Sequence, residues 1–262
     1  MTHRQQDPRD ASRRRLLKVA GIAAASSVAS GANAAGTATP AAVNPRTDRP
    51  SHPFRRLDLA RTAHLIVDLQ NGFMEQGAPV EVPAARDIIP NVNRISAAVR
   101  EAGGVNIFLR FILGEDSLKT WSVFYQKLGN SERARNIGAS FAEDQHYAAL
   151  WPKLERDPRD LILIKRRFSA FIPGTCDLHD TLQRRGIDTL IITGTLTNVC
   201  CESSARDAQQ MNYRILFASD ATAAQTIDAH NAAIQNMHNM FADVATTQEL
   251  LSFIATARQP QS

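Results

Sequence analysis

Short runs rich in β-branched residues alternate with stretches of helical spacing along most of this 262-residue chain. The run V-N-I-F-L-R-F at Val105–Phe111 is typical of a buried strand. Before it, residues 88–102 place Ile89, Val92, Ile95 and Val99 on one helical stripe, and Gly103-Gly104 ends that stripe. Such alternation means parallel strands joined by helices. It excludes all-helical and sandwich architectures.

We therefore predict an α/β fold with a doubly wound, mostly parallel six-stranded sheet and helices on both faces, because right-handed crossovers limit the strand order. No internal repeat interrupts the pattern. The expected strands lie at 63–69, 105–111, 161–165, 189–193, 214–218 and 243–246, and the expected helices at 88–102, 177–185, after Cys200, 229–241 and from 247. Residues 112–160 form a long insertion, predicted to be a helical or loop-rich excursion near the functional site.

Residues 193–208 read T-G-T-L-T-N-V-C-C-E-S-S-A-R-D-A and join the fourth predicted strand to a helix through a short loop. Cys200 is expected in the first turn of that helix. Unpaired N–H groups and the positive end of the helix dipole favour a thiolate there. The alternative is that Cys200 and Cys201 are small apolar core residues, as free cysteines often are.

Two other predicted strands end in charged residues. Asp68 follows the run A-H-L-I-V, and Lys165 ends the run L-I-L-I-K. Taken singly, Asp68 could be a strand-end turn residue and Lys165 a solvated charge, because charged residues are mostly on the surface. The carboxyl ends of parallel strands share one edge near a switch in strand order. Together with Cys200, the pattern predicts an acid, a cation and a thiol at one place.

Three segments carry a resemblance to a known family: V-D-L-Q-N-G-F at 67–73, K-R-R-F-S-A-F at 165–171, and residues 193–208. From about residue 63 to 251 the chain resembles the isochorismatase-like cysteine hydrolases, which include nicotinamidases, N-carbamoylsarcosine amidohydrolase, and biuret and ureidoacrylate amidohydrolases. The resemblance implies a Rossmann-type three-layer fold. It also implies a catalytic triad of Asp68, Lys165 and Cys200, with Cys200 rather than Cys201 as the nucleophile.

The resemblance further implies a cis peptide between Thr195 and Leu196, and an oxyanion hole made by the backbone N–H groups of Leu196 and Cys200. The expected reaction is cleavage of a C–N bond in a small amide, urea or carbamoyl compound through a thioester. In it, Asp68 is the general acid and base and Lys165 gives electrostatic support. Two alternatives stay open: vinyl-ether hydrolysis that depends on Asp68 rather than Cys200, and a non-catalytic exported binding protein.

We predict no catalytic metal and no cofactor. Nicotinamidases of the family carry a D-x-H motif after the second strand, whereas this chain reads R-F-I-L-G-E-D at 110–116, without histidine. Nicotinamide is therefore disfavoured as a substrate. His64 faces the wrong way in the first strand. The other histidines lack ligand spacing and are expected on the surface or in packing: His146, His179, His230 and His238.

The expected small-molecule substrate site is apolar. Phe73, Trp121, Phe168 and Phe171 are candidates for its lining, with core packing as the alternative for Phe168 and Phe171. Asn71 and Asn198 either hydrogen-bond the substrate or brace loops.

Residues 1–34 resemble a twin-arginine signal peptide: S-R-R-R-L-L-K at 12–18, a weakly apolar stretch, and A-N-A at 32–34. We predict export by the twin-arginine machinery to the periplasm or exterior, with no stable membrane anchor after cleavage. A disordered basic tail and an uncleaved anchor are the alternatives. Residues 35–56 are a flexible lead-in with several prolines, and 57–262 form the hydrolase domain.

The net charge of +4 belongs to the leader, because six of the 30 basic and two of the 26 acidic residues lie in 1–34. The remainder is formally neutral, which disfavours nucleic acid as a partner. An odd count of three cysteines leaves at least one thiol unpaired. We expect Cys200 free and Cys201 buried against the sheet. The family resemblance suggests a homodimer or homotetramer.

Overall fold

A computed structural model describes residues 54, 56–114, 116–129 and 132–258. The predicted signal peptide at 1–34 and nearly all of the lead-in at 35–56 lie outside the described residues. Within the described part, none of the helices has the length and apolar character needed to cross a membrane.

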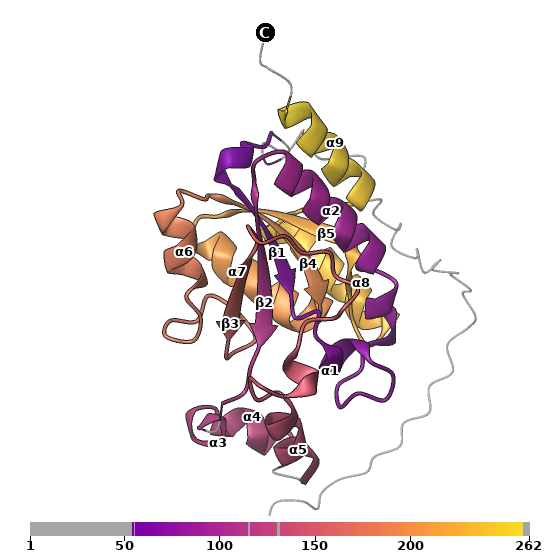
Figure 1. The fold of residues 1–262 in the computed structure, drawn as a ribbon, viewed down its shortest axis with the longest axis vertical. Coiled ribbons are helices and arrows are strands. Elements are labelled where there is room, and N and C mark those ends of the chain that lie inside the picture. Colours follow the sequence, from indigo (N-terminus) through magenta and orange to yellow (C-terminus); the bar gives the residue numbers. More distant parts are fainter. Residues whose placement is uncertain (1–53, 55, 115, 130–131, 259–262) are drawn as a thin grey trace, which may run out of the picture. The chain divides into compact units, whose positions relative to one another are not determined.

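The centre of the fold is one six-stranded sheet (Figure 1). Every strand pair in it is parallel, which confirms the predicted α/β class. The strand order is β3-β2-β1-β4-β5-β6, so the order reverses direction between β1 and β4. The strands are β1 (Thr62–Val67), β2 (Val105–Phe111), β3 (Leu161–Lys165), β4 (Thr189–Thr195), β5 (Arg214–Ala223) and β6 (Asp243–Ala245).

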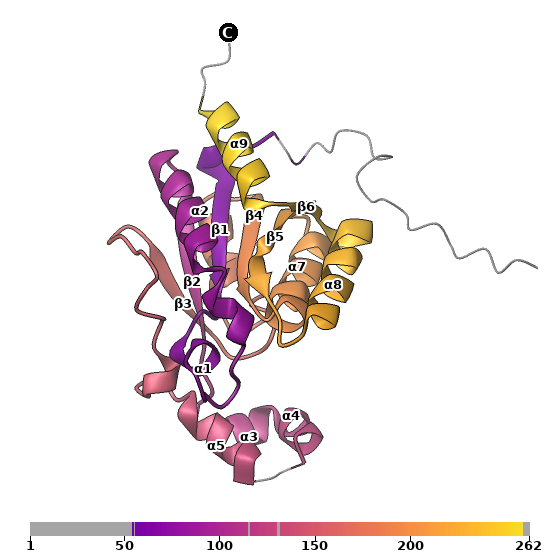
Figure 2. The ribbon, with the colours of Figure 1, turned by 90° about the vertical axis from the view of Figure 1, so that its right-hand side faces the viewer.

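Helices pack on both faces of the sheet (Figures 1 and 2). On one face, α2 (Ile89–Glu101) and α9 (Thr247–Ala257) belong to one hydrophobic cluster. Helix α2 contributes to this cluster through its predicted apolar stripe. On the other face, α6 (Leu178–Arg184) and α7 (Glu202–Gln210) join a second cluster, and α8 (Ile227–Asn236) packs beside them. Strand β1 contributes to both clusters and is buried along its whole length, as a central parallel strand must be.

Two predicted elements differ most in extent from those observed, while β1 ends two residues earlier than expected and β4 two residues later. Strand β5 continues to Ala223, five residues beyond the expected end at Ala218, because a register shift lets it pair again with the end of β4. The helix predicted over 229–241 is α8 followed by a π-helical turn at Met237–Phe241.

The insertion at 112–160 is helical at the carboxyl end of the sheet, as expected (Figure 1). It contains the short helices α3 (Ser117–Thr120), α4 (Ser122–Lys127) and α5 (Glu132–Ser140), and a 3-10 turn at His146–Ala148. Another short helix, α1 (Asn71–Met74), follows β1 at the same end. These elements surround the strand ends where the predicted site residues lie.

Candidate active site

Asp68 follows the last residue of β1 in a left-handed backbone conformation, with φ of 51°. Aspartate tolerates this region better than most residues. Its N–H donates to the Leu109 carbonyl (3.1 Å), and its carbonyl accepts from the Gln70 N–H (2.9 Å). These bonds fix the bend where the strand ends, and the Asp68 side chain is fully buried there.

Lys165 is the last residue of β3, two strands away from β1, and its side chain is also fully buried. Its Nζ lies 2.8 Å from Oδ2 of Asp68 and donates to the Arg167 carbonyl (3.0 Å). The ammonium group passes over the ring of Phe111, 4.8 Å from its centroid. Phe111 is the register partner of Lys165 on β2. The lysine thus crosses the intervening strand end to reach the carboxylate.

Cys200 lies in a π-helical turn, Thr197–Cys201, which precedes α7 rather than forming its first α-helical turn. In this turn the Leu196 carbonyl accepts from the N–H groups of Val199 and Cys201, each at 3.1 Å. The peptide bond between Thr195 and Leu196 is cis.

Gly194 lets β4 approach β1 closely before this turn. Its φ is 112°, and an added Cβ would lie 2.1 Å from the Val67 carbonyl oxygen. Only glycine fits such a position. Asp68 follows β1, and the Cys200 turn follows β4. These two strands are adjacent, and the strand order switches direction between them.

Burial dominates the electrostatics of the three groups. It raises the pKa of Asp68, although the nearby Lys165 opposes the shift. For Lys165, burial would lower the pKa, but the charges of Asp68 and Cys200 together raise it. Burial raises the pKa of the Cys200 thiol despite the neighbouring ammonium group. Burial therefore opposes the thiolate that the start of the helix was expected to favour.

The carboxylate of Asp68 lies among donors. The Lys165 ammonium group is 2.8 Å from Oδ2, and the Cys200 thiol is close enough to interact with the carboxylate. Both contacts oppose the rise in pKa that burial causes. The arrangement can move a proton between the thiol sulfur and the carboxylate.

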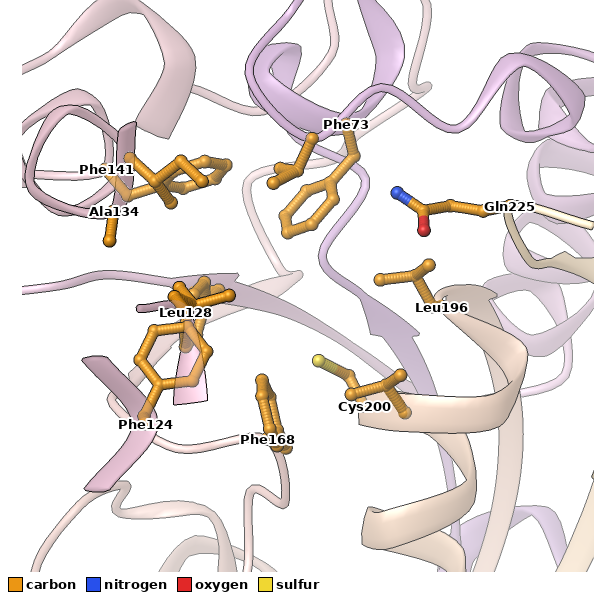
Figure 3. A pocket seen from close by; sticks show the side chains of 13 residues that line it. Phe73, Phe124, Leu128, Ala134, Phe141, Phe168, Leu196, Cys200 and Gln225 are labelled. Carbon is orange, nitrogen blue, oxygen red and sulfur yellow. The ribbon is translucent and has the colours of Figure 1, made fainter. Parts of the chain in front are cut away.

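The Cys200 sulfur points into a cavity of about 490 Å³ (Figure 3). Phe73 and Phe168 line this cavity, as anticipated. The full lining is Phe73, Val80, Phe111, Phe124, Leu128, Ala134, Ile137, Phe141, Phe168, Leu196, Val199, Cys200 and Gln225.

Four other candidates for substrate contact lie outside this lining. Trp121 packs behind it, with its ring centroid 4.4 Å from that of Phe124 and 4.7 Å from that of Phe168. Phe171 is buried in the second hydrophobic cluster against Tyr213. Asn71 donates to the His146 carbonyl (3.0 Å) and so braces the insertion. Asn198 is exposed on the π-helical turn.

The remaining cysteines and His64 have structural surroundings. All three cysteines are unpaired, and Cys201 is fully buried in the second hydrophobic cluster, as expected. His64 is buried between β2 and β4, with Nε2 2.8 Å from Oγ1 of Thr193 and Nδ1 3.2 Å from Oδ1 of Asn106. Burial lowers the pKa of His64 to about 3. It is a neutral core residue.

The other histidines are dispersed. His146 pairs with Glu75 at 2.6 Å, His179 contacts the Tyr213 hydroxyl at 3.0 Å, and His230 contacts Oγ1 of Thr197 at 3.0 Å. Throughout the part of the chain that the structure describes, no three His, Cys, Asp or Glu residues gather as a metal-binding group.

Sequence reasoning missed nine of the 13 lining residues, among them Phe111, Phe124, Phe141 and Gln225. The signal for Phe111 was present, since it ends a predicted strand at the same edge as Asp68. Gln225 follows the unpredicted extension of β5. Phe124 and Phe141 lie in and just after the short helices of the insertion, whose inward faces the sequence does not specify.

Comparison with known proteins shows the family of this chain. The family model described as "Isochorismatase domain" matches residues 62–249, which include all six strands. The chain belongs to the isochorismatase family. As a family member it is a hydrolase.

Relatives within the isochorismatase family differ in what is known of them. Ureidoacrylate amidohydrolase RutB of Variovorax paradoxus is 29% identical, over 77% of this chain and 84% of that protein. An Arabidopsis thaliana relative carries the name "Probable inactive nicotinamidase" and is 31% identical, over 72% of this chain and 93% of its own. A cysteine hydrolase structure from Pseudomonas syringae pv. phaseolicola superposes with a TM-score of 0.70 at 28% identity, covering 77% of this chain and 96% of that one.

Proposed function

We propose that this isochorismatase-family protein is an amidohydrolase that cleaves the C–N bond of a small amide, urea or carbamoyl compound through a thioester on Cys200. The observation that carries the proposal is the buried Asp68–Lys165 pair beside a thiol that faces a cavity. Similarity to the ureidoacrylate amidohydrolase supports C–N bond cleavage in particular.

The first half of the reaction forms the thioester. Cys200 starts as a neutral thiol, because burial raises its pKa. As the sulfur attacks the carbonyl carbon, Asp68 accepts the thiol proton, and the negative charge moves to the carbonyl oxygen. The N–H groups of Leu196 and Cys200 are proposed to stabilise this oxyanion, a contact worth about 3–4 kcal/mol per donor. The tetrahedral intermediate then expels the amine, which takes the proton from Asp68.

The second half hydrolyses the thioester. A water molecule gives a proton to Asp68 and attacks the acyl carbon, and the C–S bond breaks. The thiolate recovers the proton from Asp68, and the carboxylic or carbamic acid leaves. Lys165 contacts the carboxylate throughout at 2.8 Å and stabilises its ionised form. Without that positive charge, a buried carboxyl would stay protonated and could not act as the base.

Replacement of Cys200 tests the proposal. The full chain and its Cys200→Ala variant are incubated with a panel of small amides, ureas and carbamoyl compounds, and ammonia release is measured. We expect loss of all activity in the variant, and an acyl adduct on the wild-type Cys200 peptide in intact-mass and peptide mapping. Cys176→Ser is the matched control, because Cys176 is also an unpaired thiol but does not line the cavity.

The alternatives give different results in the same experiment. Full retention of activity in Cys200→Ala would contradict the thioester route and favour isochorismatase-type vinyl-ether hydrolysis through Asp68. A wild-type chain with no turnover, no adduct and a Cys200 no more reactive than an unfolded cysteine would support a non-catalytic binding protein.

We also propose that residues 1–34 direct twin-arginine export and are then removed, which leaves a periplasmic or secreted enzyme. Replacing Arg13 and Arg14 by lysine should hold the uncleaved chain in the cytoplasm in cell fractionation. Recovery of the wild-type chain in the membrane fraction would instead indicate an anchor. A homodimer or homotetramer is proposed from the family resemblance, and light scattering of the purified protein tests it.

A further inference from the structure

The cavity above Cys200 is apolar on almost every side (Figure 3). Of its 13 lining residues, only Cys200 and Gln225 carry a polar side chain. Five phenylalanine rings form most of the remaining wall: Phe73, Phe111, Phe124, Phe141 and Phe168. A cavity of about 490 Å³ lies in the range of sites that enclose drug-sized ligands. It is therefore larger than an unsubstituted amide or urea group requires.

The described lining contains no cation to receive an acidic substrate. Lys165 lies just beneath the cavity, but its ammonium group is paired with Asp68. Arg167 stacks behind the wall, with its guanidinium carbon 5.0 Å from the Trp121 ring centroid. Its N–H groups donate to the carbonyls of Arg166 (2.7 Å) and Thr120 (2.8 Å). Neither positive group is available to a carboxylate in the cavity.

Within the lining that the structure describes, Gln225 supplies the one neutral hydrogen-bonding side chain besides the thiol. It follows β5, and its amide turns toward the cavity beside Leu196 (Figure 3). No hydrogen bond joins this amide to another of the described residues. An amide of this kind can both donate to and accept from an uncharged polar group.

We propose that the substrate is an amide or urea whose acyl side is uncharged and apolar, either aromatic or a hydrocarbon chain, with Gln225 as the specificity contact for a neutral polar group. This inference rests on the proposed function, because it places the scissile carbonyl at Cys200. It separates the chain from an enzyme for ureidoacrylate, the substrate in the RutB relative's name, since that molecule carries a carboxylate.

The expected effects are large enough to measure. Each methylene added to a buried acyl chain should raise kcat/KM about fourfold until the cavity is filled. A terminal carboxylate on the same chain should lower kcat/KM by about a hundredfold or more, because its charge would lose water without gaining a partner.

The test compares matched substrates with the full-length protein. Butanamide, hexanamide and 4-methylbenzamide form the apolar set. Adipic acid monoamide and 4-carboxybenzamide are their acidic counterparts, and ureidoacrylate is included. We expect ammonia release to increase along the apolar set and to be at least a hundredfold slower for the acidic compounds. If ureidoacrylate or either acidic amide were turned over faster than the apolar amides, the inference would be overturned and the amidohydrolase proposal would stay intact.

Binding measurements keep the inference testable if no amide is turned over. Calorimetric titration of Cys200→Ala with hexanamide and with adipic acid monoamide measures selectivity without chemistry. Tighter binding of hexanamide supports an apolar site even if none of these amides is hydrolysed. Equal or tighter binding of the acidic compound contradicts it.

Two variants test the named contacts. Leu128 lines the cavity but is 38% exposed, so Leu128→Lys adds a charge that can still reach water. We expect this variant to raise kcat/KM for adipic acid monoamide at least tenfold relative to hexanamide. Met240→Lys is the control, because Met240 is 73% exposed and does not line the cavity. Gln225→Leu should lower kcat/KM about threefold to tenfold for amides whose acyl side carries an uncharged polar group. It should leave kcat/KM for hexanamide unchanged. No change for any substrate would refute the role of Gln225.

Discussion

The ion pair between Asp68 and Lys165 should have a stability signature that distinguishes a buried pair from two independent residues. Both side chains are fully buried, with Nζ and Oδ2 2.8 Å apart. At an effective dielectric constant of about 20, the attraction over that distance is about 6 kcal/mol. Most of it offsets the cost of removing both charges from water. The pair is therefore costly to break from one side and nearly neutral to remove whole.

We expect Lys165→Met and Asp68→Asn each to lower the free energy of unfolding by about 3–5 kcal/mol, because each leaves one buried charge without its partner. The double variant should lie within about 2 kcal/mol of the wild type, since no charge remains uncompensated. Asparagine is the right replacement at position 68 because it tolerates the left-handed backbone there. All three variants should lose amidohydrolase activity.

Urea unfolding at pH 7, followed by tryptophan fluorescence, measures the three free energies. A second measurement at lower pH sharpens the test. In Lys165→Met, burial raises the folded-state pKa of Asp68 above its unfolded value, so stability is lost as pH rises through that pKa and returns as pH falls. Additive losses in the double variant, or a Lys165→Met deficit that does not shrink on acidification, would refute the reasoning.

Three further predictions follow from other residues. The acid limb of kcat/KM should lie above the usual aspartate pKa of about 3.9, because burial raises the pKa of Asp68 and its protonated form cannot accept the thiol proton; a limb at or below pH 4 would argue against Asp68 as the base. His64 has a folded pKa of about 3, so its contribution of about 5 kcal/mol is present above the unfolded pKa of about 6.5 and is lost progressively as pH falls from there through the folded pKa. Acid unfolding of His64→Gln should be less steep, and equal pH dependence in wild type and variant would contradict this. Gly194→Ala should destabilise the fold by at least about 4 kcal/mol in urea titration, because its Cβ would meet Val67 at 2.1 Å. Gly103→Ala, at φ of 84° with open space around it, should lose only about 1–2 kcal/mol.

The regular strands and helices with clear hydrophobic periodicity were predictable from the sequence. The boundaries of β2 and β3 match the predicted runs, and α2 shows its predicted stripe, because hydrophobic periodicity reports burial directly. The rule that parallel strands end at one edge brought Asp68, Lys165 and Cys200 to one region. Asp68 and Lys165 were predictable because each directly follows or ends an apolar run, and Cys200 because a short loop joins it to another such run.

Features set by tertiary contacts were not predictable. The second half of β5 depends on pairing with the end of β4, which local sequence does not encode. The raised pKa of the Cys200 thiol depends on how completely the site is buried. In the insertion, helices of four to nine residues are too short to show which side faces the cavity. For that reason Trp121 was expected in the lining where Phe124 is found.

The reacting groups and much of the surrounding wall come from separate stretches of the chain. The reacting groups lie at or just after strand ends: Asp68 after β1, Lys165 at the end of β3 and Cys200 in the turn after β4. Much of the wall instead belongs to one continuous stretch, 117–141, which supplies Phe124, Leu128, Ala134, Ile137 and Phe141. Exchanging that stretch for another would alter which molecules enter while the strands stay in place. A single insertion or recombination event could thus change which substrates the enzyme accepts and leave its reacting groups unchanged.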